Sequence, residues 1–405
     1  MVNDAVNDIT MAPEIIAFEE MLDSLCAMDL ENPYFRTHDG IAYDTSSING
    51  RECINYTGYN YLGFSGDARV SQKAKEAIDM YGTTVSASRP IAGERMIHQS
   101  LEREIADFLG VENAVAIISG YATNFSTIGH LFHRKDVILY DEKSHNSIVQ
   151  GAYLSKAKMI PFTHNDMGDL ECLLVKHRRH FKKALIVTEG VFSVDGDIPD
   201  LPRIIALKKA HSCAVMVDEA HSLGVLGECG KGITEYFGVN PKDIDILMGT
   251  LSKSLASCGG YIAGSARLIR YLKYTLPGFV FSVGLPPTNT VAALTSLRLL
   301  KENPERVARL QRNGNFFRER AKTHGLNIGP SRDSGIVPVR IGASTRAMLL
   351  SNYLYKNGIN VSPMIAPAVP EGEATLRFFI VADHSEEQMV YTLEKVEKGL
   401  VLHCQ

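Results

Sequence analysis

The sequence predicts an α/β protein whose large domain has a mostly parallel sheet and is followed by a smaller α+β domain. Two observations lead to this fold class. Apolar runs of four or five residues alternate with helical stretches through the middle of the chain, which is typical of parallel strands covered by helices on both faces. Small or polar residues follow these runs near positions 119, 145, 189, 218 and 250. Because parallel strands end at one edge of a sheet, these residues should lie together.

The length and charge of the chain are those of a globular protein with more than one domain. It has 405 residues and a net charge of −4, and so lacks the basic excess expected of a nucleic-acid-binding protein. The seven cysteines include no Cys-x-x-Cys pair, which favours reduced thiols in the cytoplasm over disulfides or a metal site. No apolar run approaches the ~18 residues of a membrane span, so we expect a cytoplasmic protein without a transmembrane segment.

We expect three parts along the chain: an N-terminal segment of residues 1–54, a large domain of residues 55–290 and a small C-terminal domain of residues 291–405. In the first part, apolar residues at helical spacing predict a helix around residues 15–22, and Asn49-Gly50 predicts a hairpin. The large domain begins with an aromatic, turn-rich stretch at residues 55–64. A packed loop and the wall of a substrate pocket are equally compatible with this stretch.

The remaining elements follow in order. Helices are predicted at residues 70–81 and 101–109, each followed by a glycine, with small side chains around Arg89 between them. Strands of the large domain are predicted at residues 114–118, 137–140, 184–188, 214–217, 244–248 and 259–263, the last running antiparallel. A long helical region, predicted at residues 288–300 and 304–324, leads to the smaller α+β segment, whose strands are predicted at residues 335–341, 359–362 and 376–382.

One lysine stands among small and hydroxyl residues at the end of a predicted strand. Thr250-Leu251-Ser252-Lys253 places two hydroxyls and an amine at the carboxyl end of the strand, where α/β sheets bind ligands. Such a lysine is suited to form a Schiff base and the hydroxyls are suited to bind a phosphate, which together indicate pyridoxal 5′-phosphate. The competing interpretation is a solvated lysine that only caps the strand.

Three further residues change that balance. Asp218 ends a buried strand 35 residues before Lys253, where a carboxylate would keep the pyridine nitrogen protonated, although it could also be a helix cap. His221 is placed to reach the cofactor's phenolic oxygen, and His145 could lie flat on the ring, although a lone histidine is more often structural. Residues 119–124 open a helix whose first amides would bind a phosphate.

These motifs resemble those of a known family. The resemblance is carried by residues 60–63, 119–124, 144–145, 188–193, 218–221 and 249–253, and by Arg377 with residues 382–384. It is to the α-oxoamine synthases, pyridoxal phosphate enzymes of the fold-type I transferase class. The resemblance implies a homodimer with the active site at the subunit interface. It also implies condensation of an amino acid with an acyl thioester, which yields an α-amino ketone, CO2 and a free thiol.

The resemblance also implies a role for each matching residue. Lys253 would be the Schiff-base lysine, Asp218 the partner of the pyridine nitrogen, His221 the partner of the phenolic oxygen and His145 the residue stacked on the ring. The phosphate would be bound by Gly120, Tyr121, Thr250 and Ser252, with Ser193 lining the cofactor site and Ser282 reaching across the dimer. The substrate would contact Arg377, Tyr59, Asn60 and Arg89, with Arg377 on its carboxylate.

Two stretches predict which substrates this member of the family uses. Tyr59-Asn60 and residues 84–89 look like serine palmitoyltransferases and polyketide-associated synthases. They predict a small L-amino acid, serine before alanine or glycine, and a long acyl chain on coenzyme A or an acyl-carrier protein. The basic run at residues 177–183 is a solvated helix end or, less favoured, a docking patch for such a carrier.

Four alternatives remain open at this point. An 8-amino-7-oxononanoate synthase or a 2-amino-3-ketobutyrate CoA ligase-type enzyme would keep the family and change the substrates. A fold-type I aminotransferase would share the lysine and the aspartate. A non-catalytic binding protein with this fold is disfavoured because Lys253, Asp218 and His145 are all present.

Overall fold

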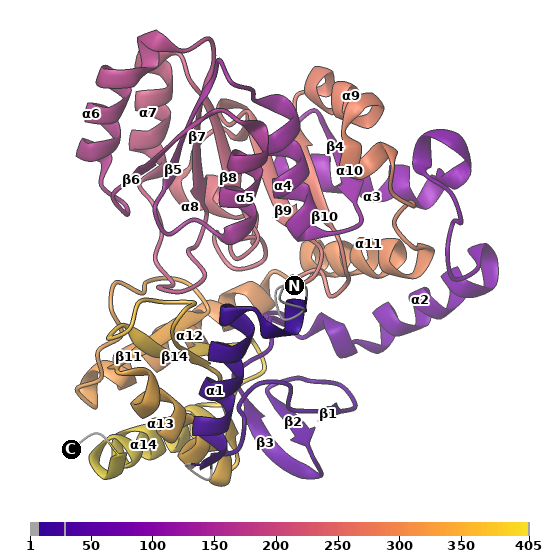
Figure 1. The fold of residues 1–405 in the computed structure, drawn as a ribbon. Helices are drawn as coiled ribbons and strands as arrows, with labels where there is room; N and C mark the ends of the chain where they lie inside the picture. Colours follow the sequence, from indigo (N-terminus) through magenta and orange to yellow (C-terminus); the bar gives the residue numbers. More distant parts are fainter. Residues whose placement is uncertain (1–7, 28–29, 404–405) are drawn as a thin grey trace, which may run out of the picture.

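The structure is a computed structural model that describes residues 8–27 and 30–403. It has an upper lobe built on a large sheet and a lower lobe that holds two small sheets (Figure 1). The strands are β1 (His38–Asp39), β2 (Thr45–Ile48), β3 (Arg51–Asn55), β4 (Asn113–Ile117), β5 (Val137–Asp141), β6 (Lys158–Phe162), β7 (Ala184–Glu189), β8 (Ala214–Asp218), β9 (Ile246–Thr250), β10 (Gly260–Gly264), β11 (Ile336–Gly342), β12 (Ile359–Asn360), β13 (Pro363–Met364) and β14 (Ala374–Phe379).

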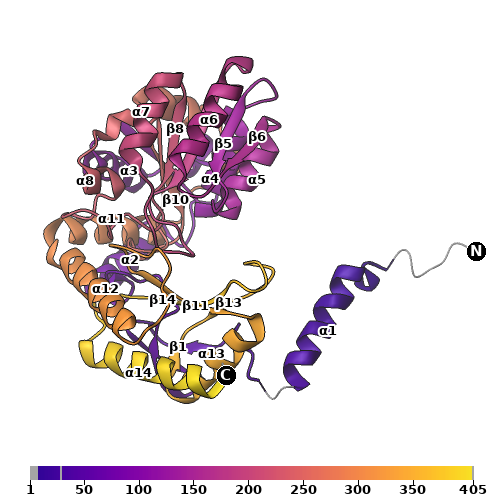
Figure 2. The ribbon, with the colours of Figure 1, turned by 90° about the vertical axis from the view of Figure 1, so that its left-hand side faces the viewer.

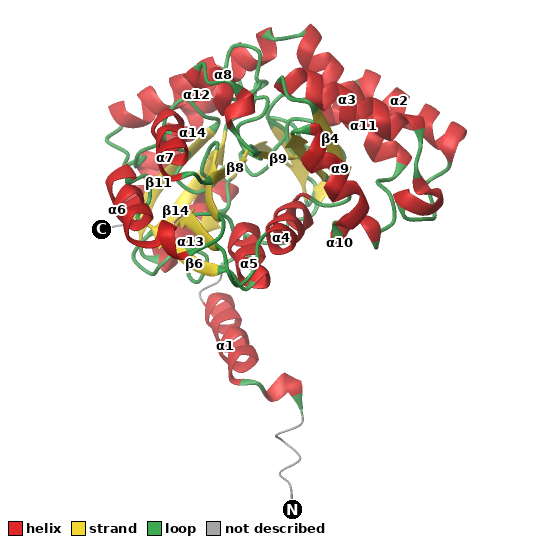
Figure 3. Ribbon diagram, turned by 90° about the horizontal axis from the view of Figure 1, so that it is seen from above, coloured by secondary structure: helices red, strands yellow, loops and turns green. Residues whose placement is uncertain are grey.

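The α-helices cover both faces of the large sheet and the outside of the lower lobe (Figure 3). They are α1 (Pro13–Ala27), α2 (Ala68–Tyr81), α3 (Met96–Leu109), α4 (Gly120–Leu131), α5 (Asn146–Ser155), α6 (Met167–His177), α7 (Leu201–His211), α8 (Ile233–Phe237), α9 (Ala266–Thr275), α10 (Pro277–Val280), α11 (Pro287–Glu302), α12 (Glu305–Thr323), α13 (Ser344–Lys356) and α14 (Glu386–His403). No helix among residues 8–27 and 30–403 is long and apolar enough to cross a membrane.

The large sheet confirms the predicted α/β architecture. Its strand order is β4-β10-β9-β8-β7-β5-β6, and β10 runs antiparallel to both of its neighbours, as the sequence predicted for this strand. β6 was not predicted, because Lys158 and Pro161 interrupt its apolar pattern. Gly249 in β9 has no side chain because the ring of Tyr261 on β10 occupies the space: a Cβ there would lie 2.3 Å from that ring.

The core lies on both faces of this sheet because alternate residues of each strand point to opposite sides. Ile186, Val217 and Leu247 pack into one apolar cluster, and Val187 and Met248 pack into another. Strands that are buried on both faces read as continuous apolar runs, which is why they could be recognised in the sequence. Because β7, β8 and β9 run parallel, their polar carboxyl ends lie together at the edge of the sheet that faces the lower lobe (Figure 1).

The lower lobe is built from both the N-terminal and the C-terminal parts of the chain. The predicted hairpin is present, with Asn49 and Gly50 in the left-handed conformation that its turn requires. β3 then pairs in parallel with β12, so the N-terminal strands extend a sheet of the C-terminal lobe. Tyr56 packs among the buried aromatic rings of Phe317 and Phe378 in that lobe. α1 stands apart from both lobes (Figure 2).

Candidate active site

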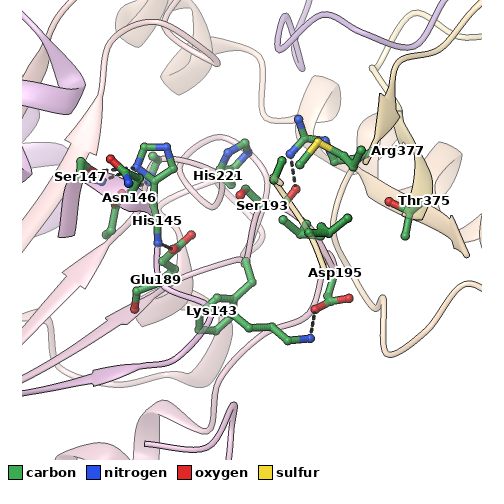
Figure 4. Close-up of a pocket in the computed structure, with 18 of the residues that line it drawn as sticks. Lys143, His145, Asn146, Ser147, Glu189, Ser193, Asp195, His221, Thr375 and Arg377 are labelled. Carbon is green, nitrogen blue, oxygen red and sulfur yellow. Dashed lines mark hydrogen bonds and ion pairs between the residues drawn. The ribbon is translucent and has the colours of Figure 1, made fainter. Parts of the chain in front are cut away.

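A cavity of about 1590 Å³ lies between the lobes at the carboxyl ends of the central strands. Eleven of the residues predicted for the site line it: Tyr59, Gly120, Tyr121, His145, Ser193, Asp218, His221, Thr250, Ser252, Lys253 and Arg377. Figure 4 shows one part of this cavity, with Arg377 from the lower lobe facing Ser193 of the upper lobe. Ligand pockets in proteins commonly span about 300–1,000 Å³, so this one has room for more than a cofactor.

Lys253 lines the cavity and takes part in a chain of hydrogen bonds. Its Nζ lies 2.9 Å from His221 Nε2, and His221 Nδ1 lies 2.8 Å from Tyr61 Oη. Burial lowers the pKa of Lys253 to about 8, against the opposing effect of the Asp218 carboxylate. Burial and the neighbouring Lys253 hold the pKa of His221 well below its usual value, so the imidazole is neutral. A charged lysine can only donate, so Nε2 of His221 then accepts and Nδ1–H donates to Tyr61.

Asp218 ends β8 with its carboxylate buried and bonded from two sides. Oδ2 accepts a hydrogen bond from Asn124 Nδ2 at 2.6 Å, and Oδ1 accepts one from the Ala220 amide at 2.9 Å. Asn124 Nδ2 also donates to Ser147 Oγ at 3.0 Å, which links Asp218 to the segment that carries His145. These donors orient the carboxylate in the low-dielectric interior.

His145 caps α5 and is held by a buried acid. Its amide donates to Glu189 Oε1 at 2.5 Å, and its Nδ1 lies 2.7 Å from Ser147 Oγ. Burial lowers the pKa of His145. Glu189 pairs with Asp218 across strands β7 and β8, and burial together with this neighbouring carboxylate raises the pKa of Glu189 well above its usual value. Glu189 therefore holds its proton more tightly than an ordinary carboxyl group, and it fixes the His145 backbone.

The start of α4 meets the end of β9 in a narrow cradle. A Cβ on Gly120 would lie 2.8 Å from Thr250 Oγ1, so a larger residue would push the helix away from the strand. Ser252 Oγ lies 3.1 Å from Thr250 Oγ1, and Tyr121 lines the cavity next to them. Helix N-terminal amides beside two hydroxyls form an arrangement that binds phosphate.

Arg377 on β14 brings a half-buried positive charge to the opposite wall. Its Nη1 donates to the Ser193 carbonyl at 2.9 Å (Figure 4), and its Nε is buried without a hydrogen-bond partner. Within residues 8–27 and 30–403, no ion pair joins Arg377 to a carboxylate. Burial lowers the pKa of the guanidinium. A buried charge without a counter-ion is costly, so a ligand carboxylate is the expected partner.

Three predicted site residues do not line the cavity. Arg89 lies in a buried ion pair, with Nε 2.5 Å from Glu94 and Nη1 2.5 Å from Glu102, so its predicted contact with substrate has no geometric support in the single chain. Asn60 braces its own loop by accepting from the Ser65 amide and donating to the Ala42 carbonyl. Ser282 lies beside the exposed Phe281, outside the cavity.

Several residues of the site had no role assigned from sequence. Glu189, Asn124 and Tyr61 stood within the recognised motifs, but a motif does not show which side chain contacts which. Glu189 carried a usable signal, because an acidic residue that ends a fully buried strand needs a partner or a proton. Nothing in the sequence distinguished Asn124 and Tyr61 from ordinary helix and loop residues.

Comparison with known proteins decides the family. The model of the class I and II aminotransferase family matches residues 51–396. This chain belongs to that family. An 8-amino-7-oxononanoate synthase of Fervidobacterium nodosum is 42% identical over 355 residues, which cover 87% of this chain and 89% of the relative. A serine palmitoyltransferase of Sphingobacterium spiritivorum is 36% identical over 363 residues, covering 90% of each chain.

Solved structures agree with the sequence relatives. The serine palmitoyltransferase of Sphingomonas wittichii superposes with a TM-score of 0.93 at 30% identity, covering 98% of this chain and 99% of that one. Both named activities are those of α-oxoamine synthases, so this member of the class I and II aminotransferase family is an α-oxoamine synthase, as the motifs predicted. It has the fold-type I transferase fold and is a pyridoxal phosphate-dependent acyltransferase.

The residues of this chain fit pyridoxal 5′-phosphate. Gly120 lets the start of α4 lie close to the Thr250 hydroxyl, Asp218 offers an oriented carboxylate, and Lys253 offers an amine whose lowered pKa leaves a neutral fraction near pH 7–8. The partnerless Nε of Arg377 lies beyond these groups. The cavity therefore holds every group that this cofactor requires from a protein.

Proposed function

We propose that this α-oxoamine synthase condenses a small L-amino acid, serine before alanine or glycine, with a long-chain acyl thioester. The observation that carries the proposal is the half-buried guanidinium of Arg377, which pairs with no carboxylate among residues 8–27 and 30–403 and lines the same cavity as Lys253. It binds the carboxylate of the amino acid through charged hydrogen bonds. The cavity of about 1590 Å³ then leaves room for the second substrate.

In this proposal each wall of the cavity binds one part of the cofactor. Gly120, Tyr121, Thr250 and Ser252 would bind the phosphate, Asp218 the pyridine nitrogen and His221 the phenolic oxygen. His145 would stack on the ring, and Ser193 would line the cofactor site. Asn124 and Glu189 support two of these groups, because they fix the Asp218 carboxylate and the His145 backbone. When bound, pyridoxal phosphate supplies an electron sink for the charge left on the substrate α-carbon.

Lys253 acts first through its amine and then as a base in this scheme. Its amine would hold the cofactor through the aldehyde in the resting enzyme and would be free once the amino acid is bound. Nζ then takes the proton of the α-carbon, for which it must be neutral, and a pKa of about 8 supplies that form near physiological pH. His221, neutral and 2.9 Å away, keeps Nζ aimed into the cavity.

The acyl chain lies along the apolar part of the cavity in this proposal. Ile341, Met364, Pro367, Ala368 and Val369 line that part, all from the lower lobe. Each methylene buried there contributes up to about 0.8 kcal/mol, so affinity should rise with chain length until the apolar wall ends. Coenzyme A and an acyl-carrier protein are both compatible donors, because each presents its acyl group on a thioester.

A second candidate keeps the reaction and changes the substrates. The 42% identity to an 8-amino-7-oxononanoate synthase favours that activity, whereas the TM-score of 0.93 to a serine palmitoyltransferase favours the long-chain reading. The two activities differ in the donor that they require, so a comparison of donors separates them. Acyl donors with a terminal carboxylate would favour the first, and unsubstituted long chains the second.

We also propose that two copies of the chain form a homodimer. Large apolar side chains are exposed on the upper lobe at Ile91, Tyr153, Tyr274 and Phe281, and a second copy would cover them. In such a dimer Ser282, next to Phe281, would reach the phosphate site of the partner. Light scattering of the purified protein would test this proposal. The wild type should be a dimer, and the Phe281→Glu variant should no longer form it.

A cytoplasmic location is proposed from the cysteines. Cys53, Cys172, Cys213, Cys229 and Cys258 are all free thiols in the described chain. Such a set of unpaired thiols is typical of a reducing compartment. The location would be tested by treating cells with a thiol-trapping reagent, separating the cell fractions, and measuring in which fraction the protein is found with its thiols free.

The reaction is tested by counting both released products. Enzyme with pyridoxal phosphate is incubated with 1-¹⁴C-labelled serine, alanine or glycine and with acyl thioesters of increasing length, while CO2 and free thiol are measured together. Equal release that increases with chain length supports the proposal. Keto acid without CO2 would indicate an aminotransferase, and equal release that peaks with the shortest donors would reject the long-chain assignment.

A further inference from the structure

A second group of charged side chains lies beside the cavity, and the proposed reaction uses none of them. His164 follows β6, with its Nδ1 2.8 Å from Asp141 Oδ1 and its Nε2 3.0 Å from Asp197 Oδ2. Only 12% of the His164 side chain is exposed, and both aspartates are buried. The two ring nitrogens therefore face one carboxylate each in a partly dry environment.

This geometry gives the ring both protons. Ionised carboxylates can only accept hydrogen bonds, so each ring nitrogen must donate, and a ring that donates from both nitrogens is a cation without a free lone pair. Burial opposes the charge, but the bonds to Asp141 and Asp197 raise the pKa of His164 to about 9. The other charged groups nearby are Glu142, which accepts the His164 amide, and Asp195, which is paired with Lys143 and Arg340.

The histidine joins three segments that are distant in the sequence. Asp141 ends β5, His164 follows β6, and Asp197 lies in segment 192–197, which follows β7. Asn165 repeats the link: its amide donates to Asp141 Oδ2 at 2.9 Å and its Nδ2 to Asp197 Oδ2 at 2.6 Å. Asn165 has φ 55°, a left-handed conformation that asparagine tolerates better than most residues.

Segment 192–197 is in turn the contact between the two lobes at the site. It is closed by hydrogen bonds from the Phe192 amide to the Asp197 carbonyl and from the Gly196 amide to the Phe192 carbonyl. Its Ser193 carbonyl accepts from Arg377 at 2.9 Å, and its Gly196 carbonyl accepts from Ser334 Oγ at 2.8 Å. A side chain that fixes this segment therefore also fixes the Ser193 carbonyl to which Arg377 donates.

We propose that His164 is a positioning residue: as a cation clamped between Asp141 and Asp197, it fixes segment 192–197 and, through Ser193, holds Arg377 in place for the substrate carboxylate. The inference rests on the proposed role of Arg377. A neutral imidazole donates from one nitrogen only, so deprotonation removes the charged hydrogen bond to one of the two buried carboxylates and leaves that carboxylate with its bond from Asn165. The segment is then held less firmly, and amino-acid affinity falls as the pH rises through about 9.

The first test compares His164→Gln with His324→Gln in the holoenzyme. His324 is a matched control, because it also pairs with an acid, Glu397 at 2.7 Å, but it lies away from the cavity. At pH 7 we expect His164→Gln to raise the serine dissociation constant tenfold or more, with cofactor affinity and the thioester KM changed less than threefold. His324→Gln should change none of the three by more than threefold.

The pH dependence separates a positioning role from a structural one. The ratio of variant to wild-type dissociation constants should fall toward one near pH 10, where the wild-type ring is also neutral; the amine of serine titrates equally in both measurements and cancels. Adding Asp197→Asn to His164→Gln removes one of the uncompensated carboxylates and should recover at least threefold of the lost affinity. A ratio that stays constant between pH 7 and 10 would overturn the proposal, as would an equal loss of serine, cofactor and thioester binding.

A second measurement needs no variant and does not depend on Arg377. Hydrogen–deuterium exchange at histidine C2, followed by mass spectrometry of the holoenzyme, reports the titration of each ring. A midpoint for His164 above pH 8 supports the clamp, and a midpoint near 6.5 overturns it. If Arg377→Met leaves serine affinity unchanged, the carboxylate site itself fails, and this outcome is distinguishable because the exchange reports the His164 ring alone.

Discussion

Replacing Arg377 by methionine should weaken substrate binding without weakening the fold. Methionine keeps the length of the apolar stem and removes the charge. Charged hydrogen bonds to a carboxylate contribute about 1.5–3 kcal/mol, and about 1.4 kcal/mol is a factor of ten, so serine affinity should fall about 10- to 150-fold. Cofactor affinity should not change, because Arg377 comes from β14 of the lower lobe, whereas the phosphate cradle is formed by α4 and β9 of the upper lobe.

Arg377→Met should not destabilise the fold, although substitutions in the interior of a protein usually do. Arg377→Met removes one hydrogen bond to Ser193, which costs about 0.5–1.5 kcal/mol. It also removes a half-buried charge that no carboxylate pairs with among residues 8–27 and 30–403, and the desolvation of such a charge opposes folding. The unfolding midpoint should therefore stay unchanged or rise.

Arg318→Met is the matched control for this experiment. Arg318 is also a buried arginine that donates to a backbone carbonyl, that of Ser334, but it does not line the cavity. Serine affinity is read from the change in cofactor absorbance during a titration of the holoenzyme, and stability from differential scanning calorimetry. The reasoning is refuted if serine affinity in Arg377→Met stays within threefold of wild type, or if its midpoint drops by more than 5 °C. Arg318→Met should leave serine affinity unchanged.

Three further outcomes are expected. Borohydride reduction of the holoenzyme followed by peptide mapping should label Lys253, and a label on another lysine would contradict its role. In the cofactor-free protein, the rate at which an amine-reactive reagent modifies Lys253 should rise with a midpoint near pH 8, whereas a midpoint near 10.5 would show an unperturbed amine. Gly120→Ala should weaken cofactor binding at least tenfold, since its Cβ would lie 2.8 Å from Thr250 Oγ1 and overpacking costs about 1–3 kcal/mol; equilibrium dialysis with Thr250→Ser as a milder control would show it.

The stability of the fold should also depend on the charge of His164. The two aspartates raise the folded-state pKa to about 9, above the ordinary value of 6.5. The stabilisation by the cation is therefore complete below pH about 6.5 and is lost as the pH rises through about 9. Denaturant unfolding between pH 6 and 10 should show this decline in the wild type and a flatter profile in His164→Gln.

The fold could be predicted because the buried strands are continuous apolar runs. Val187 and Met248 belong to strands that are covered on both faces. The apolar pattern and the short length of these runs therefore both indicated strands. β6 was missed for the opposite reason: it lies at the sheet edge, where Lys158 and Pro161 are tolerated and interrupt the apolar pattern. The pairing of β3 with β12 is a contact between distant segments and leaves no local signal.

The candidate site was predictable where chemistry depends on residue type and order. Lys253 and Asp218 follow strands that share an edge, so their meeting in one cavity follows from the topology. Arg89 shows the limit, because a single arginine in a loop does not reveal that Glu94 and Glu102 will neutralise it. His164 escaped notice because its partners come from β5 and from the segment after β7, which no spacing in the sequence connects.

The pairing of β3 with β12 has a consequence for the synthesis of the protein. Asn55 and Asn360, which are hydrogen-bonded across this junction, are separated by 305 residues of chain. Ribosomes add about 5–20 residues per second, so the N-terminal hairpin waits about 15–60 s for its partner strand to emerge. During that time the upper lobe can already form around its own sheet, while Tyr56 remains without the aromatic rings of Phe317 and Phe378 that will bury it. Completion of the lower lobe, and with it the delivery of Arg377 to the cavity, is therefore among the last events of folding.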